Sequence, residues 1–146
     1  MHADGSMGAM FRRAEAVPFE PVAVGWGGLL GGAALVAGAA VSGPLGPAIA
    51  LAGCLAGGFM TGVRAQGRRL AHGMLTGALA LGFYLTFILL ARAAGALGVS
   101  ATAPELVPDG AAWPAIFLAA LAAAVLGAAI ADRMLRPRRP RHRIGA

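Results

Sequence analysis

Charged side chains are scarce in this sequence of 146 residues, and acidic ones are half as common as basic ones. Charged residues make up 12% of the chain, whereas hydrophobic residues make up 58%. The six acidic residues are Asp4, Glu15, Glu20, Glu105, Asp109 and Asp132, and all lie outside the long apolar blocks or at their ends. Transporters that couple to protons or cations usually carry an ionisable group inside the membrane. The sequence therefore argues against that class of protein.

Cysteine and recognisable catalytic motifs are also nearly absent. Cys54 is the only cysteine, so an internal disulfide cannot form, and within its apolar block it is expected to act as a small hydrophobic residue. The sequence has no H-E-x-x-H, no nucleophile elbow, no phosphate-binding P-loop and no His, Cys and carboxylate group at metal-ligand spacing. We therefore predict a protein that is not an enzyme and that uses no cofactor or metal.

The sequence does contain four long uncharged blocks rich in alanine, leucine and glycine. They run from about residue 22 to 42, 45 to 63, 70 to 91 and 113 to 131. Each is close to the roughly 20 residues that a helix needs to cross a hydrocarbon core about 30 Å thick. Strands would leave unpaired backbone groups in lipid, so the blocks should be helices. The predicted fold class is all-α: a polytopic membrane protein with a four-transmembrane-helix bundle and glycine-rich helix packing.

This interpretation divides the chain into three parts. Residues 1–21 are predicted to be a disordered cytoplasmic segment, 22–131 the four-helix transmembrane domain, and 132–146 an arginine-rich cytoplasmic tail. Between the first two blocks, the motif SGPLGP supplies a tight turn and a proline suited to the first turn of the next helix. The first two helices should therefore form a hairpin.

The N-terminal region also admits a second interpretation. Arg12 and Arg13, followed by an apolar block that ends in small residues, resemble a signal peptide. Glu15, Glu20 and the nearby prolines interrupt the approach to the apolar block, which favours a retained first helix. Cleavage would leave three helices without changing the later topology.

The basic residues predict the orientation of the helices. All twelve are arginines: two precede the first block, three lie between the second and third, and six follow the fourth. The remaining one, Arg92, ends the third block beside a loop that carries Glu105 and Asp109. Positive residues are enriched in cytoplasmic loops. We therefore predict a multi-pass protein of the inner (plasma) membrane with both termini in the cytoplasm.

The C-terminal tail concentrates half of the positive charge. Its arginines are Arg133, Arg136, Arg138, Arg139, Arg141 and Arg143. Arginines beside a membrane span are attracted to anionic lipid by about 1 kcal/mol each while they lie near the surface. The tail has no aromatic residue for base stacking, which argues against nucleic acid. The expected partners are the bilayer and its anionic headgroups, with a protein partner as the alternative.

The hairpin sequence GGFMTGVRAQGRRLAHGMLTG, residues 57–77, has small residues at every fourth position on both sides of an arginine cluster. Such spacing lets membrane helices approach closely. The glycines predicted to lie at helix contacts are Gly53, Gly57, Gly58, Gly62, Gly73 and Gly77. Because Gly58 and Gly77 lie at similar depth from the loop, we expect them to face each other across the second and third helices.

The same hairpin contains a possible interfacial polar site made of Arg64, Arg68, Arg69 and His72. Arginines in such a loop set the topology, and their side chains can extend to the headgroups. His72 lies about one turn inside the third block, where it could pair with Gln66, a backbone carbonyl or a lipid phosphate, or could change charge near neutral pH. A structural hydrogen-bonding role is the favoured interpretation.

Three short motifs of the hairpin carry a family resemblance. They are GGF at Gly57–Phe59, G-x-x-A at Gly62–Ala65, and H-G-x-x-x-G followed by a tyrosine-bearing apolar stretch at His72–Tyr84. Over roughly residues 50–90 this pattern resembles the small YrzE-like family of uncharacterised bacterial membrane proteins. The resemblance implies four membrane spans and no assigned activity. The long arginine tail and the proline-containing outer loop depart from the family pattern.

Two classes of function fit these features. The first is a non-enzymatic integral membrane protein, structural or accessory, that self-associates or packs against a larger membrane complex. The second is a small oligomeric pore or carrier whose path is lined by uncharged helices. The polar residues Thr61, Thr76, Tyr84 and Thr86 are available to such a path, but each can satisfy itself on a helix carbonyl or a neighbour. The first class is favoured.

Overall fold

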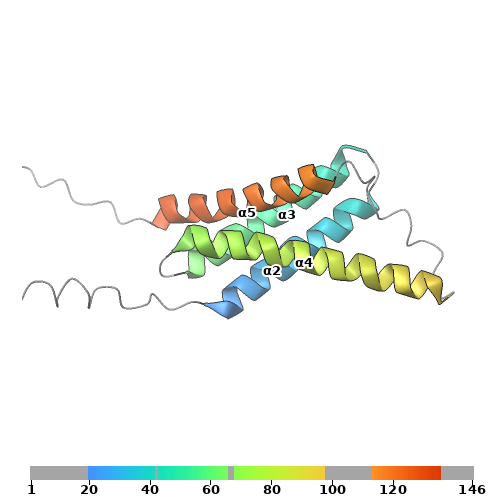
Figure 1. The fold of residues 1–146 in the computed structure, drawn as a ribbon. Helices are drawn as coiled ribbons and strands as arrows, with labels where there is room; N and C mark the ends of the chain where they lie inside the picture. The colour runs from blue at the N-terminus through green and yellow to red at the C-terminus, as the bar shows by residue number, and fades with distance from the viewer. Residues whose placement is uncertain (1–19, 42, 66–67, 98–112, 136–146) are drawn as a thin grey trace, which may run out of the picture.

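The computed structural model describes residues 20–41, 43–65, 68–97 and 113–135, which fold into four helices and, within these ranges, no strand (Figure 1). The helices are α2 (Pro21–Ala40), α3 (Leu45–Arg64), α4 (Arg69–Ala96) and α5 (Trp113–Leu135). All four are long and apolar enough to cross a membrane. The prediction of an all-α fold with four membrane-crossing helices is confirmed.

Local sequence explains where several of these helices begin and end. Pro21 opens α2, a position where the missing N–H of proline costs nothing. The turn between α2 and α3 contains Gly43 at φ +76°, a backbone conformation that glycine adopts readily. Two helices continue past the predicted spans: α4 extends from residue 91 to Ala96, and α5 from residue 131 to Leu135. No proline interrupts either extension, so nothing in the sequence ends the helix earlier.

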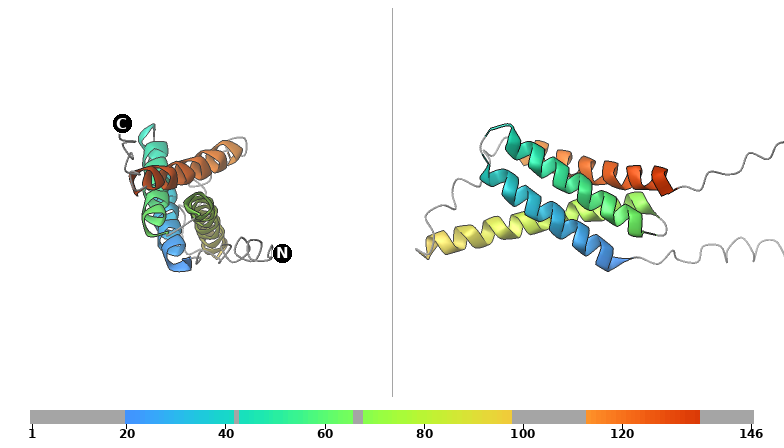
Figure 2. Two further views of the ribbon diagram at one scale, coloured as in Figure 1. Left: turned by 90° about the vertical axis from the view of Figure 1, so that its left-hand side faces the viewer. Right: turned by 180° about the vertical axis from the view of Figure 1, so that it is seen from behind.

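Each helix packs against at least two others, and α3 and α4 each contact all three of the others. Contacts join α2 to α3 and α4, α5 to α3 and α4, and α3 to α4. The beginnings of α2 and α4 and the ends of α3 and α5 lie together at one end of the bundle (Figures 1 and 2). We call this the arginine end, because Arg64, Arg69 and Arg133 belong to it, and the opposite end the far end.

Most of the fully buried side chains of the bundle are small, and many large apolar side chains are exposed. Alanines of α5 such as Ala124 and Ala128 are fully buried, whereas Leu89 and Leu90 of α4 are 67% and 65% exposed. A soluble protein would turn such leucines inward, but in lipid the outer surface of a bundle can be as apolar as its interior. The larger buried side chains, Leu35, Leu81, Tyr84 and Ile88 among them, form a cluster with Cys54, Ala80 and Ala120. The distribution fits a bundle surrounded by lipid.

Candidate functional site

A chain of hydrogen bonds links three helices inside the bundle, toward the arginine end. The hydroxyl of Thr76 on α4 lies 2.9 Å from the hydroxyl of Thr61 on α3, and Thr61 lies 3.2 Å from the carbonyl of Ala23 on α2. Each threonine also lies within 3.0 Å of the carbonyl four residues before it in its own helix, Gly57 or His72. A hydroxyl carries one proton, so it serves one of these acceptors at a time. Both side chains are thus satisfied within the bundle, as the sequence predicted.

His72 occupies the junction between the beginnings of α2 and α4. Its side chain is buried, and its Nε2 atom accepts a hydrogen bond of 3.4 Å from the backbone N–H of Glu20. Since Nε2 is an acceptor, a neutral ring carries its proton on Nδ1, which lies 3.1 Å from the carbonyl oxygen of Arg68. The ring therefore joins the first turn of α4 to the residue that precedes α2. Of the partners considered for His72, the structure provides a backbone carbonyl.

Arg69 turns toward α5 and forms an ion pair. One of its terminal nitrogens lies 3.1 Å from Oδ1 of Asp132, and its Nε donates to the carbonyl of Ala65. The two charged side chains are 19% and 26% exposed, so they are partly shielded from solvent. No sequence motif marks this pair, although Arg69 directly precedes the third apolar block and Asp132 directly follows the fourth, at the same end of the bundle.

The Arg69–Asp132 pair is expected to contribute about 1 kcal/mol to stability, the upper range for a pair that is partly exposed. A double-mutant cycle with Arg69→Gln and Asp132→Asn, read from thermal melting in mild detergent, should show coupling of that size. The control replaces Arg69→Gln by Arg133→Gln, because Arg133 is exposed and adjacent in sequence to Asp132. Equal coupling energies in both cycles would show that the cycle measures the change in net charge and not the Arg69–Asp132 ion pair.

The other two arginines of the predicted polar site point elsewhere. Arg64 and Arg68 are exposed, and Arg68 has a left-handed backbone conformation, φ 47°, just before α4. The structure therefore does not bring the four predicted residues together into one site: His72 contacts the beginning of α2, Arg69 contacts α5, and Arg64 and Arg68 face outward. Within the tail, only Arg133 belongs to the described residues, and it is exposed. The other five tail arginines lie outside them.

The six predicted packing glycines all lie against a neighbouring helix. A Cβ atom added at each would come within contact distance of another helix: Gly53 against Ala34, Gly57 against Gly27, Gly58 against Ala124, Gly62 and Gly73 against Ala128, and Gly77 against Leu121 and Ala124. For Gly57 and Gly58 the nearest atoms are backbone carbonyls. At these two positions even an alanine side chain would collide with the backbone of the next helix.

The expected pairing of Gly58 with Gly77 differs from the structure. The atoms nearest to both glycines belong to α5, where both approach Ala124. Two glycines of α3 do approach a glycine, but both partners belong to α2: Gly57 faces Gly27, and Gly46 faces Gly38. Small residues at every fourth position make a helix able to approach closely, but they do not specify which helix comes near. Here the alanine-rich α5 takes the position that the sequence analysis gave to α4.

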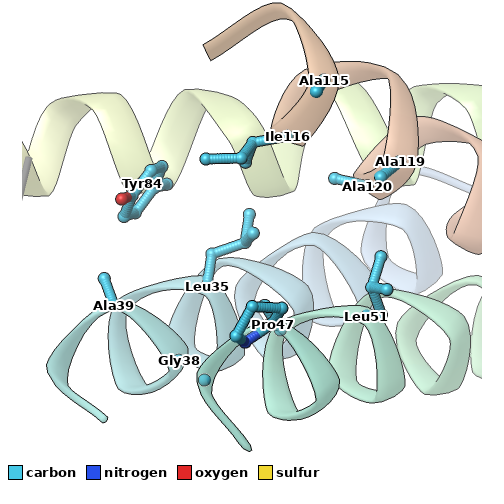
Figure 3. A pocket seen from close by; sticks show the side chains of 12 residues that line it. Leu35, Gly38, Ala39, Pro47, Leu51, Tyr84, Ala115, Ile116, Ala119 and Ala120 are labelled. Atoms are coloured by element: carbon cyan, nitrogen blue, oxygen red, sulfur yellow. The ribbon is translucent and has the colours of Figure 1, made fainter. Parts of the chain in front are cut away.

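The far half of the bundle contains an apolar cavity of about 390 Å³ (Figure 3). All four helices contribute to it: Leu35 and Ala39 from α2, Pro47 and Leu51 from α3, Tyr84 from α4, and Ile116, Ala119 and Ala120 from α5, among others. Among the described residues that line it, Tyr84 is the one with a polar side chain. No sequence motif marks this cavity. It forms because most of its lining residues are alanine, glycine or proline, whose side chains are small.

The described residues bring together few side chains that could bind a metal or carry out chemistry. Among the residues that the structure describes, no group of three His, Cys, Asp or Glu side chains is placed to hold a metal ion. The polar groups near the arginine end bond to one another and to helix carbonyls, so their arrangement supports helix association within the chain.

Comparison with known proteins adds no further guide: no protein-family model, no curated protein and no solved structure matches the chain. The resemblance of residues 50–90 to the YrzE-like family therefore stays a prediction.

Proposed function

We propose that the chain is a non-enzymatic integral membrane protein with a structural or accessory role, which associates through its helices with a second copy or with a larger membrane complex. One observation carries the proposal: an exposed row of small residues on α4, made of Ala78, Gly82 and Thr86 at four-residue spacing. An added Cβ at Gly82 would meet nothing within 4 Å.

Most glycines of the four helices lie in contact with a neighbouring helix, whereas an added Cβ at Gly82, as at Gly25, would meet nothing within 4 Å. The six packing glycines are taken up by contacts with neighbouring helices, so they are not a surplus that a partner could use. On the Gly82 row, the hydroxyl of Thr86 bonds the carbonyl of Gly82, which leaves the helix surface both small and satisfied. A surface of this kind permits close approach of a helix from another chain.

The pore or carrier alternative has less support. Thr61 and Thr76 would be the polar lining of a path, but their hydroxyl groups are buried and bonded inside the bundle. The far cavity has apolar walls apart from Tyr84, which suits hydrocarbon better than a hydrated solute.

Affinity purification in mild detergent tests the accessory role. The parent chain should recover a stoichiometric partner or form a discrete homo-oligomer, and Gly82→Leu should abolish that recovery without lowering the folded yield. The control is Ala33→Leu, which enlarges an exposed residue on α2. A monomer without partner would contradict the proposal, and a homo-oligomer that makes liposomes leaky would support the pore instead.

We further propose that the arginine end faces the cytoplasm of the inner membrane and contacts anionic headgroups. Arg64, Arg68 and Arg133 are exposed at this end, and the far end of α4 carries only Arg92 among the described residues. Reporter fusions after residue 69 and at the C-terminus are expected to be cytoplasmic, and a fusion near Asp109 extracytoplasmic. A cytoplasmic signal from Asp109 would overturn this topology. Deleting the tail should weaken binding to anionic vesicles without inverting the helices.

A further inference from the structure

We propose that the far cavity is a binding site for a single hydrocarbon chain of a membrane lipid. The cavity lies among the last residues of α2, the first residues of α3 and α5, and Tyr84 near the middle of α4. Its volume of about 390 Å³ falls in the range of roughly 300–1,000 Å³ that small-molecule sites occupy. This site is distinct from the Gly82 row proposed for helix association.

The exposure of the lining residues locates the mouth of the cavity. Tyr84, Gly38 and Ala120 are buried and form the floor, whereas Leu51 is 40% exposed and Ala115 is also exposed. The cavity therefore opens between the beginnings of α3 and α5. Leu51 lies six residues after the first residue of α3, or about 9 Å along the helix axis. At that depth in a membrane-crossing helix the mouth faces lipid chains.

The chemistry of the walls selects hydrocarbon as the occupant. Water needs two to four polar partners in a buried site, and Tyr84 carries the single polar side chain in the part of the lining that the structure describes. An empty cavity would deprive the lining atoms of dispersion contacts. In Figure 3 the side chains of Leu35, Ile116 and Tyr84 point toward a common space, which leaves an apolar slot between them. A lipid chain is the apolar group present in excess at the mouth.

Photolabelling in vesicles tests this site on the full chain. The protein is reconstituted into phosphatidylethanolamine and phosphatidylglycerol vesicles that contain a phosphatidylcholine with a diazirine on one acyl chain, then irradiated, digested and mapped by mass spectrometry. We expect adducts to concentrate on Pro47–Leu51 and on residues 115–120. We also expect this labelling to saturate as the fraction of photolipid rises, whereas labelling of exposed Leu126 should increase in proportion. Proportional labelling at both places would overturn the site.

Two variants fill the cavity from different helices. Ala119→Phe on α5 and Ala39→Leu on α2 should each remove most of the saturable label. Ala122→Phe is the matched control, since Ala122 is exposed on α5 and does not line the cavity, and it should keep the label. Folded variants that keep the label would overturn the proposal. So would unlabelled lining peptides in the parent, the result expected if residues 98–112 of this chain or a second copy fill the cavity.

Discussion

Gly58→Ala is expected to destabilise the bundle by about 3 kcal/mol or more, the upper range for overpacking a helix contact. The added methyl group would collide with the backbone of Ala124 on α5, and backbone atoms cannot turn aside as the end of a side chain can. The two helices would have to separate, which would also disturb the contacts of Gly62 and Gly77 with α5. Thermal melting and folded yield in mild detergent would measure the loss.

Gly82→Ala is the matched control for this prediction. It makes the same chemical change in a membrane helix, but its methyl group would meet nothing within 4 Å. Alanine also favours a helix over glycine by up to about 1 kcal/mol in soluble helices. We expect this variant to melt at or above the temperature of the parent. Equal stability of the Gly58 and Gly82 variants would show that α3 and α5 do not meet at Gly58.

His72→Ala is expected to cost about 2–4 kcal/mol, as for other large buried side chains replaced by alanine. The substitution leaves a cavity between α2 and α4, and it removes the ring that bonds the N–H of Glu20 and the carbonyl of Arg68. His72→Gln should be milder, because its amide can still donate to a carbonyl near the former Nδ1. The melting temperature in mild detergent should be highest for the parent, lower for His72→Gln and lowest for His72→Ala.

Met74→Ala controls for the loss of side-chain volume. Met74 is two residues further along α4, and it is 59% exposed on the outside of the bundle. Removing it should change the melting temperature little. If His72→Ala were as mild as Met74→Ala, the histidine would not hold the beginnings of α2 and α4 together, and a functional role for its ring would become the better explanation.

The number and approximate position of the helices could be predicted from the sequence. A helix that crosses lipid must have about 20 apolar residues, and few other structures require such a segment. The uncharged blocks and the SGPLGP turn mark α2 and α3 within a residue or two at each end. The hydroxyl groups of Thr61 and Thr76 could also be assigned to internal hydrogen bonds, since a buried hydroxyl in lipid needs a partner and a helix carbonyl is always near.

The pairing of the helices could not be predicted in the same way. Gly58 fits against any helix that presents a small residue at its depth, so the choice between Gly77 and Ala124 depends on how all four helices pack together. The Arg69–Asp132 pair was missed for a related reason: the positive-inside rule counts arginines and gives acidic residues little weight. The cavity arises from side chains that are too small to fill the far half, which appears only when the helices are assembled.

The length of α4 has a consequence for the thickness of membrane in which the protein sits best. Arg69 and Arg92 are 23 positions apart on one continuous helix, about 35 Å along its axis. A hydrocarbon layer about 30 Å thick fits between these two charges with a modest tilt, whereas a thicker layer would draw one guanidinium into the acyl region or force the helix upright. By contrast, α2 has no charged residue from Pro21 to Ala40, so no charge of its own fixes its depth. The energetic cost of a mismatch between protein and bilayer thickness would therefore arise mainly at α4, whose two arginines set the thickness that fits best.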